Sequence, residues 1–284
     1  MKLYTIDTEL FRLDGGAMFG VVPKALWNKL LPADENNMCE LAMRCLLIKD
    51  EERLILIDTG IGNKQDEKFL SRYLLHGSNT LDKSLAKHGY SKEDITDVFL
   101  THLHFDHVGG AVEKSGKLLA PTFKNAVYWS NKSHWNWAKE PNARESASFL
   151  KENILPLQES KQLQFIDIPK NHELISFTDN ISIRFVSGHT KDMMLPQIRY
   201  KNRTVVFVAD LIPTAAHLLT PYIASYDMFP LQTIQEKTIF LEEALAKDYI
   251  LFFEHDAQVE CCTLCKNEKG KVVVKDSFTT ADII

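Results

Sequence analysis

The sequence at residues 101–110 reads THLHFDHVGG, which places three histidines and one aspartate within six positions. On an extended segment, side chains two residues apart point the same way, so His102 and His104 can share one metal ion. Asp106 and His107 follow where the chain has to turn, and the two glycines permit that turn and a close approach of the backbone. Imidazole and carboxylate donors together are typical of catalytic metal sites rather than of cysteine-rich structural ones. The stretch therefore predicts a metal site that could hold two ions.

Two ions need more ligands than one loop supplies, and three further candidates each follow an apolar run that predicts a strand. His189 follows ISIRFVSG, Asp210 follows TVVFVA, and His255 follows YILFFE. In α/β proteins, sites are commonly built at the carboxyl ends of strands. A carboxylate can hold two cations close together, and Asp210 is the natural bridge. We therefore expect these three side chains to complete the ligand set.

The rest of the chain alternates strand-like apolar runs with stretches of helical periodicity, which is typical of an α/β protein. No repeat or linker divides it, so we expect a single domain over residues 1–284. Hairpins are expected at 45–57 and around a turn at 269–270. The other expected strands are 96–101, 126–129, 181–187, 204–210 and 249–254, and the expected helices are 67–76, 79–87, 144–157 and 233–247.

The composition excludes several classes of protein. With 45% hydrophobic and 25% charged residues, the chain is neither collagen-like nor largely disordered. The 33 Lys and Arg against 38 Asp and Glu give a net charge of -5, so no nucleic-acid partner is expected. No apolar run reaches the roughly 18 residues that span a bilayer, and no signal peptide is visible, so we expect no membrane partner and a cytoplasmic location. The five cysteines are expected to be reduced, and the CxxC pair at 262–265 lacks the second pair of a zinc site.

Taken together, these motifs resemble those of the metallo-β-lactamase superfamily. HLHFDH at 102–107 is followed by His189, Asp210 and His255 in the order typical of that family, and the Asp58-Thr59-Gly60 turn is similar to its early strand-end motif. The resemblance covers about residues 40–256. It implies an α/β fold of the αββα type, a four-layer sandwich in which helices flank two mixed β-sheets and the metal site lies along one edge.

The resemblance also implies a ligand assignment for two divalent metal ions per chain, for which zinc suits the donors. Asp58 is implied to orient ligands without binding a metal. The implied ligands are His102, His104 and His189 for one ion, Asp106, His107 and His255 for the other, and Asp210 as the bridge.

Two segments resemble one branch of the superfamily, the quorum-quenching N-acyl homoserine lactonases and methyl parathion hydrolase-like proteins. They are DGGAMFGVVPK at 14–24 and DLIPT at 210–214, the latter followed by His217, Tyr226-Asp227 and Pro230. His104 stands where an oxygen-reducing diiron member carries Glu, which favours hydrolysis. Known lactonases place a Tyr three residues after the bridging Asp, but here that position is Pro213. His217 or Tyr222 could take its role.

The substrate wall has two possible interpretations. Met18, Phe19, Val21, Phe105 and Met193 could line an apolar channel for an acyl chain, because methionine adapts to chains of several lengths. The same residues could equally belong to the core. Trp135 and Trp137 are expected to pack within a helix. The histidines outside the motif, His76, His88, His134 and His172, are expected on the surface or in the core.

The expected mechanism is metal-assisted hydrolysis of a small-molecule lactone. A hydroxide held by two metals attacks the carbonyl, and Asp106 or Asp210 carries the proton to the leaving ring oxygen. The main alternative is hydrolysis of aryl phosphotriesters. A thioesterase and a β-lactamase are weaker alternatives, and sequestration of an acylated signal would leave the ligand set unexplained. The apolar N-terminal segment could reach a partner subunit in a homodimer.

Overall fold

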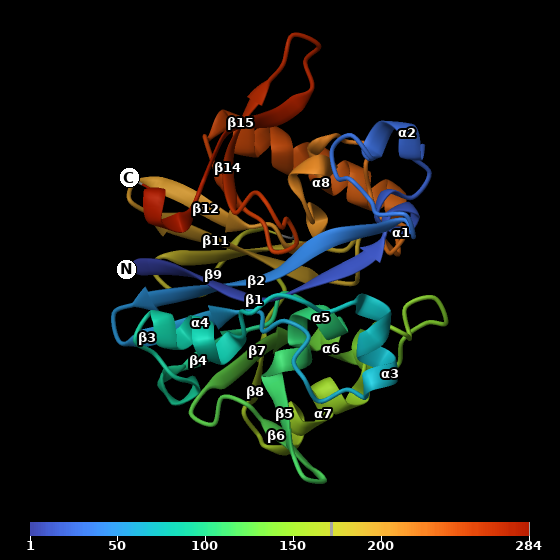
Figure 1. Cartoon of the computed structure of the whole chain (residues 1–284). Helices are drawn as coiled ribbons and strands as arrows, with labels where there is room; N and C mark the ends of the chain where they lie inside the picture. Colours follow the sequence, from blue (N-terminus) through green and yellow to red (C-terminus); the bar gives the residue numbers. More distant parts are fainter. Residues whose placement is uncertain (171–172, 284) are drawn as a thin grey trace. The chain divides into compact units, whose positions relative to one another are not determined.

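The structure is a computed structural model that describes residues 1–170 and 173–283 (Figure 1). His172 therefore lies outside the described residues. Contacts divide the chain into two compact units, each built from two stretches. The first unit comprises Met1–Leu10 and Met43–Ile168, and the second comprises Phe11–Ala42 and Pro169–Ile284. That the whole chain, residues 1–284, forms a single domain stays a prediction.

A mixed six-stranded sheet supplies the frame of the first unit. The predicted hairpin is confirmed, because β2 and β3 pair antiparallel with Leu47 opposite Leu56. From β3 onward the neighbouring strands β4, β7 and β8 pair parallel. In sheet order the strands are β1 (Lys2–Asp14), β2 (Met38–Asp50), β3 (Arg53–Ile57), β4 (Asp97–Phe99), β7 (Val127–Asn131) and β8 (Leu163–Ile166).

The helices of the first unit connect these strands and bury one apolar core with them. Leu56, Val98 and Tyr128 from the sheet and Trp135 and Ile154 from the helices lie in this core, each at most 1% exposed. Burial of such side chains contributes roughly 1.5–3 kcal/mol each. The elements are α3 (Glu67–Leu70), η1 (Ser71–Tyr73), α4 (Leu81–Lys87), η2 (Lys92–Asp94), α5 (Phe105–Val108), η3 (Gly109–Ala111), α6 (Lys132–Lys139) and α7 (Lys151–Glu159), with a hairpin of β5 (Val112–Ser115) and β6 (Leu118–Pro121).

A mixed seven-stranded sheet forms the second unit. Among the described residues, β12 and β13 pair parallel and the other neighbours in the sheet pair antiparallel. The predicted C-terminal hairpin is confirmed as β14 and β15. In sheet order the strands are β15 (Val272–Phe278), β14 (Cys261–Lys266), β13 (Ile250–Phe252), β12 (Arg203–Phe207), β11 (Met193–Tyr200), β10 (Ile181–Val186) and β9 (Ile175–Ser176). The helices are α1 (Gly15–Phe19), α2 (Lys24–Trp27), η4 (Ala209–Leu211), η5 (Ala215–Leu218), α8 (Pro230–Ala246) and η6 (Thr280–Asp282).

Several predicted elements differ in their bounds from the structure, and for two of them the reason is visible. The helix predicted at 144–157 starts only at Lys151, because the Asn142 side chain accepts hydrogen bonds from the N–H groups of Arg144 and Glu145 and holds a turn there. The strand predicted at 204–210 ends at Phe207, and Ala209, with φ 41°, starts the turn that carries Asp210. The first strand, β1, and the two short helices after it have no counterpart in the prediction.

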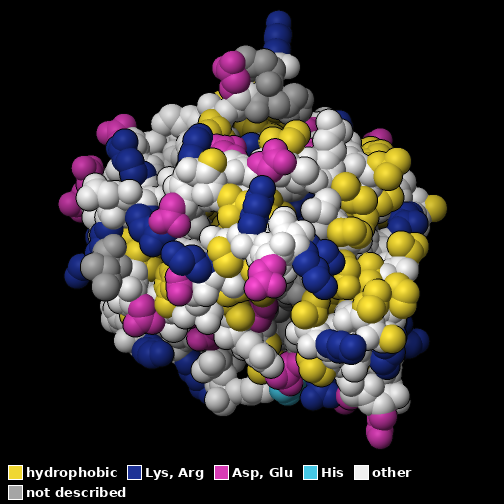
Figure 2. All heavy atoms as spheres, turned by 90° about the horizontal axis from the view of Figure 1, so that it is seen from above, with side chains coloured by type: hydrophobic (Ala, Val, Ile, Leu, Met, Phe, Trp, Pro, Cys, Tyr) yellow, Lys and Arg dark blue, Asp and Glu magenta, His cyan; other side chains and the backbone are white. Residues whose placement is uncertain are grey.

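The surface drawn in Figure 2 mixes positive and negative side chains, while hydrophobic ones gather on one side of the view. On this face of the described chain, no extended field of one sign is visible, which agrees with the small net charge. Exposed large apolar residues of the second unit include Val21, Leu26, Phe229 and Leu231. Within the described parts of the chain, no helix combines the length and the apolar character needed to cross a membrane.

Candidate metal centre

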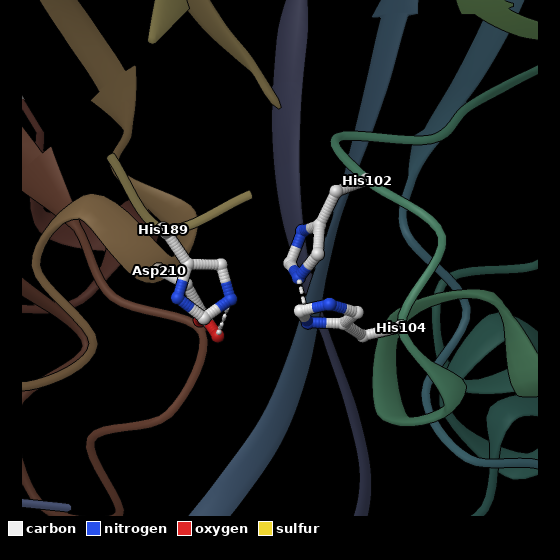
Figure 3. A group of neighbouring side chains, drawn as sticks. All are labelled: His102, His104, His189 and Asp210. Carbon is white, nitrogen blue, oxygen red and sulfur yellow. Dashed lines mark hydrogen bonds and ion pairs between the residues drawn. The ribbon is translucent and has the colours of Figure 1, made fainter. Parts of the chain in front are cut away.

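The first unit brings four predicted ligands together on the loop after β4 and on α5. His102, His104, Asp106 and His107 are all buried. The His102 Nε2 and His104 Nδ1 atoms lie 3.0 Å apart, and Figure 3 shows the two rings turned toward each other. Two ring nitrogens this close can face one cation, as the alternation along an extended segment predicted.

Asp58, which follows β3, holds this loop from behind. Its carboxylate accepts hydrogen bonds from the Thr101 N–H at 2.8 Å and the Thr101 hydroxyl at 2.5 Å, and it lies 3.1 Å from His107 Nδ1. Thr101 Oγ1 in turn lies 3.1 Å from His102 Nδ1. One buried carboxylate therefore orients His107 directly and His102 through a hydroxyl, which is the orienting role expected for Asp58.

The two glycines at the end of the motif allow a close approach of the backbone, as predicted. A Cβ atom on Gly109 would lie 2.0 Å from the carbonyl oxygen of Ile61, and one on Gly110 would lie 2.2 Å from that of Thr59. This close approach lets the N–H and the hydroxyl of Thr59 both donate to the carbonyl of His107. A larger residue at either glycine would separate the metal loop, as we call residues 101–110, from the turn that contains Asp58.

Two further side chains hold the same loop, and neither was predicted to do so. Glu145 Oε1 lies 2.9 Å from His104 Nε2, and His134 Nε2 accepts the N–H of Leu103 at 2.9 Å. Both side chains are buried. The sequence carries no signal for Glu145, because it falls in a stretch that was predicted to be a regular helix.

The second unit brings together the remaining three predicted ligands. His189 follows β10, Asp210 lies in η4 after β12, and His255 follows β13. The two oxygens of Asp210 lie 3.1 Å from His189 Nε2 and 3.1 Å from His255 Nε2, so the carboxylate stands between the two rings. Figure 3 shows the contact between His189 and Asp210. This is the position that a bridging carboxylate requires.

The far ring nitrogens of these two histidines are also engaged. His189 Nδ1 lies 2.9 Å from Asp227, and His255 Nδ1 lies 2.8 Å from the carbonyl of Ala42. Burial alone would lower the pKa of His189, but the carboxylates of Asp210 and Asp227 outweigh it and raise that pKa to about 10. The surroundings of His189 therefore favour positive charge, and a metal bound to the neutral ring would displace this proton.

The donor set fits metal ions. In each of the five histidines one ring nitrogen is oriented by a hydroxyl, carboxylate or carbonyl of its own unit, which is typical of histidines that bind metals. Among the described residues, all seven predicted ligands, with Asp58 and Glu254, belong to the groups that could hold a metal ion. These groups contain histidine and carboxylates only, the donors of catalytic rather than structural zinc sites.

The predicted substrate residues occupy different environments. Met18, Phe19 and Met193 are at most 3% exposed, whereas Val21 is 97% exposed. Phe19 is stacked between Trp27 at 5.0 Å and His217 at 4.5 Å, so both of its faces are covered and the packing alternative is favoured for it. The predicted residue in the first unit, Phe105, is 8% exposed and its ring contacts those of Phe69 and Tyr73.

His217 is fully buried, and both of its ring nitrogens have partners. Nδ1 lies 2.8 Å from the Thr214 hydroxyl and Nε2 lies 2.9 Å from the carbonyl of Met18. Burial lowers the pKa of His217 to about 3, so the ring is neutral at physiological pH. The contact with Met18 joins α1 to η5, which contains His217, and these contacts favour a structural role over the predicted place beside a lactone carbonyl.

Tyr222 lies half-buried in a loop that the buried Lys237 of α8 anchors. The Lys237 ammonium donates to the carbonyls of His217, Leu219 and Tyr222. The Tyr222 ring meets Phe19 edge-on and lines a cavity of about 310 Å³ between α8 and the β14–β15 hairpin. None of the predicted metal ligands lines this cavity among the residues that the structure describes.

Comparison with known proteins identifies the family of this chain and several proteins that are similar to it. The model of the metallo-beta-lactamase superfamily matches residues 44–255. A protein from a Bacillus species named N-acyl homoserine lactonase is 24% identical over 237 residues, which are 78% of this chain and 84% of that protein. Among solved structures, one from Staphylococcus aureus, described as a probable metal-dependent hydrolase, is 26% identical, covers 98% of both chains and has a TM-score of 0.85. AidC, a dizinc quorum-quenching lactonase solved with a product, is 22% identical, covers 98% of this chain and 95% of its own, and has a TM-score of 0.76. The predicted fold class is therefore confirmed.

Proposed function

The chain belongs to the metallo-β-lactamase superfamily, and from that premise we propose that this metal-dependent hydrolase opens the lactone ring of N-acyl homoserine lactones. The residues that would hold the divalent cations are His102, His104, Asp106 and His107 in the first unit and His189, Asp210 and His255 in the second. The observation that carries the proposal is the arrangement of His189, Asp210 and His255, because a carboxylate between two oriented imidazoles is what a dinuclear centre needs. The lactone is supported by the N-terminal segment at 14–24 and by the relative that is named a lactonase.

Two divalent cations at such a site supply Lewis-acid chemistry, because they acidify water and polarise a carbonyl oxygen. The protein residues have to position these donors and move one proton. Hydrolysis forms a bond between the lactone carbonyl carbon and a water oxygen, and breaks the bond from that carbon to the ring oxygen. The water proton then passes to the ring oxygen, which becomes the hydroxyl of the N-acyl-homoserine product.

Asp106 and Asp210 are the candidates for this proton transfer, because both are carboxylates within the donor groups. His217 is a weaker candidate, since burial lowers its pKa to about 3 and the ring is then not an imidazolium acid at neutral pH. His189 is held by Asp227 and His104 by Glu145, so the rings around the reacting atoms keep their orientation while the proton moves.

The test is acid release from a long-chain N-acyl homoserine lactone by purified protein of known metal content. We expect turnover that vanishes on chelation and returns when zinc is added. Protein that holds about two metals per chain but does not release acid would overturn the lactone assignment. Aryl phosphotriesters would be the next substrates, because a dinuclear site can attack phosphorus as well as a carbonyl carbon.

A further inference from the structure

Helix α6 holds the metal loop through two side chains that lie on one of its faces. His134 accepts the backbone N–H of Leu103, between the first two histidines of the motif, at 2.9 Å. Trp137, three residues later, donates its indole N–H to Glu145 Oε2 at 2.6 Å. Since residues three apart on a helix are neighbours, one face of α6 supports both the backbone and a ring of the loop.

Glu145 connects that helix face to His104. Its second oxygen, Oε1, lies 2.9 Å from His104 Nε2, and the Asn142 amide donates to Oε2 at 3.3 Å. The residue is only 1% exposed, so its carboxylate depends on hydrogen bonds rather than on water. Trp137, Glu145 and His104 therefore form a chain of hydrogen bonds from half-buried α6 to the candidate metal ligand.

These hydrogen bonds decide which ring nitrogen of His104 can bind a metal. A carboxylate at Nε2 fixes the proton there and leaves the lone pair on Nδ1, the atom that lies 3.0 Å from His102 Nε2. Such partners typically raise the basicity of the ligating nitrogen, and their loss costs about 10- to 100-fold in metal affinity. A cation at Nδ1 would draw electrons from the ring, strengthen the Nε2–H bond to Glu145 and alter the field at the indole of Trp137.

We infer that Glu145 is a positioning residue that sets the metal affinity of His104, and that Trp137 reports occupancy of the site through its fluorescence. Neither residue touches the reacting atoms. The inference rests on the proposed metal ligation by His104, but it does not depend on the identity of the substrate.

The first experiment measures zinc affinity by competition with a coloured chelator. We expect Glu145→Gln to bind zinc about 10- to 100-fold more weakly. The carboxylate faces His104 with Oε1 and accepts from Trp137 with Oε2, whereas the amide replaces one of these oxygens by an NH2 group that cannot accept. Asp97→Asn is the matched control. Like Glu145, Asp97 is a buried carboxylate of the first unit that accepts an indole N–H, here from Trp129 at 2.8 Å. The other hydrogen-bond partners of this carboxylate are Arg53 and Thr96, and neither is a candidate metal ligand. Its zinc affinity should equal that of the unchanged protein.

The second experiment follows tryptophan emission while zinc is added to metal-stripped protein. We expect a change that is retained in Trp129→Phe and lost in Trp137→Phe, since both tryptophans are half-buried and bonded to a carboxylate but only Trp137 reaches His104. Circular dichroism shows that each variant is folded. Unaltered zinc affinity in Glu145→Gln, or an emission change that persists in Trp137→Phe, would overturn this inference but not the proposed function. Failure of the unchanged protein to bind zinc would overturn the proposed function with it.

Discussion

The two units present their candidate ligands in different ways. In the first unit, four ligands come from one short stretch, the loop after β4 and the helix α5. In the second unit, three ligands come from the ends of three different strands, β10, β12 and β13. Despite this difference, the histidines of both sets are oriented in the same manner, by a hydrogen bond to one ring nitrogen from a partner in the same unit.

The difference shows where each geometry is encoded. The spacing of His102 and His104 along one segment is enough to place their nitrogens together, so a slip of one residue would destroy the pair. His189, Asp210 and His255 meet only because β12 lies between β11 and β13 in the sheet, with β10 as the next neighbour of β11. The first set is therefore a local property of the sequence, and the second is a property of strand order.

The largest expected effect tests whether the two sets serve one reaction. His102→Ala removes a ligand from the first set and His255→Ala removes one from the second. Each should lower turnover by more than about 100-fold, the upper end for loss of a mere orienting partner. Turnover and bound metal should be measured on the same preparations. Near-normal turnover in only one of the two variants would break the comparison, because that set would then lie outside the active centre.

The predictability of the site follows the same division. The HLHFDH stretch could be interpreted from its spacing alone, and His189, Asp210 and His255 from their places after apolar runs. Glu145 could not, because its position depends on a turn that Asn142 stabilises inside a stretch with helical periodicity. The carbonyl of Ala42, which orients His255, could not be predicted either, since every residue type has a backbone carbonyl.

The fold shows the same limit for apolar residues. The hairpin of β2 and β3 and the α/β class follow from hydrophobic periodicity. The stack of Trp27, Phe19 and His217 does not, because it joins residues far apart in the chain. A bulky apolar residue in a loop has the same composition whether it lines a channel or fills a core.

A smaller expected effect concerns the pH dependence of stability in the second unit, where the pKa values of two buried histidines are shifted in opposite directions. Two carboxylates raise the pKa of His189, whereas burial without a carboxylate partner on either ring nitrogen lowers that of His217 to about 3, from an ordinary 6.5. Between these pH values the unfolded chain binds more protons at His217 than the folded chain, so stability falls as the pH is lowered through this window. From pH 7 to pH 5 this one group should cost about 2 kcal/mol of unfolding free energy.

Urea unfolding at both pH values checks this expectation. His217→Phe keeps a ring to stack on Phe19 but has no titratable nitrogen. The variant should be less stable at pH 7, because the Met18 carbonyl and the Thr214 hydroxyl lose their partner. It should nevertheless lose about 2 kcal/mol less than the unchanged protein on acidification. Equal losses in both proteins would show that folding does not lower the pKa of His217.

The smallest expected effect concerns the N-terminal segment of the second unit, where Met18 and Phe19 are buried and Val21 is 97% exposed. If Val21 contacts the acyl chain of a substrate, Val21→Ser should raise KM about two- to fivefold for a long-chain lactone and leave that for a short-chain lactone unchanged. Stability should change by less than about 0.5 kcal/mol, because the side chain packs against little in the free protein. Leu231→Ser, at another exposed apolar position (81%) of the same unit, is the control and should leave both KM values unchanged. Equal KM values for Val21→Ser and the unchanged protein would remove this segment from the substrate wall and leave the acyl chain to other residues, such as Phe105 in the first unit.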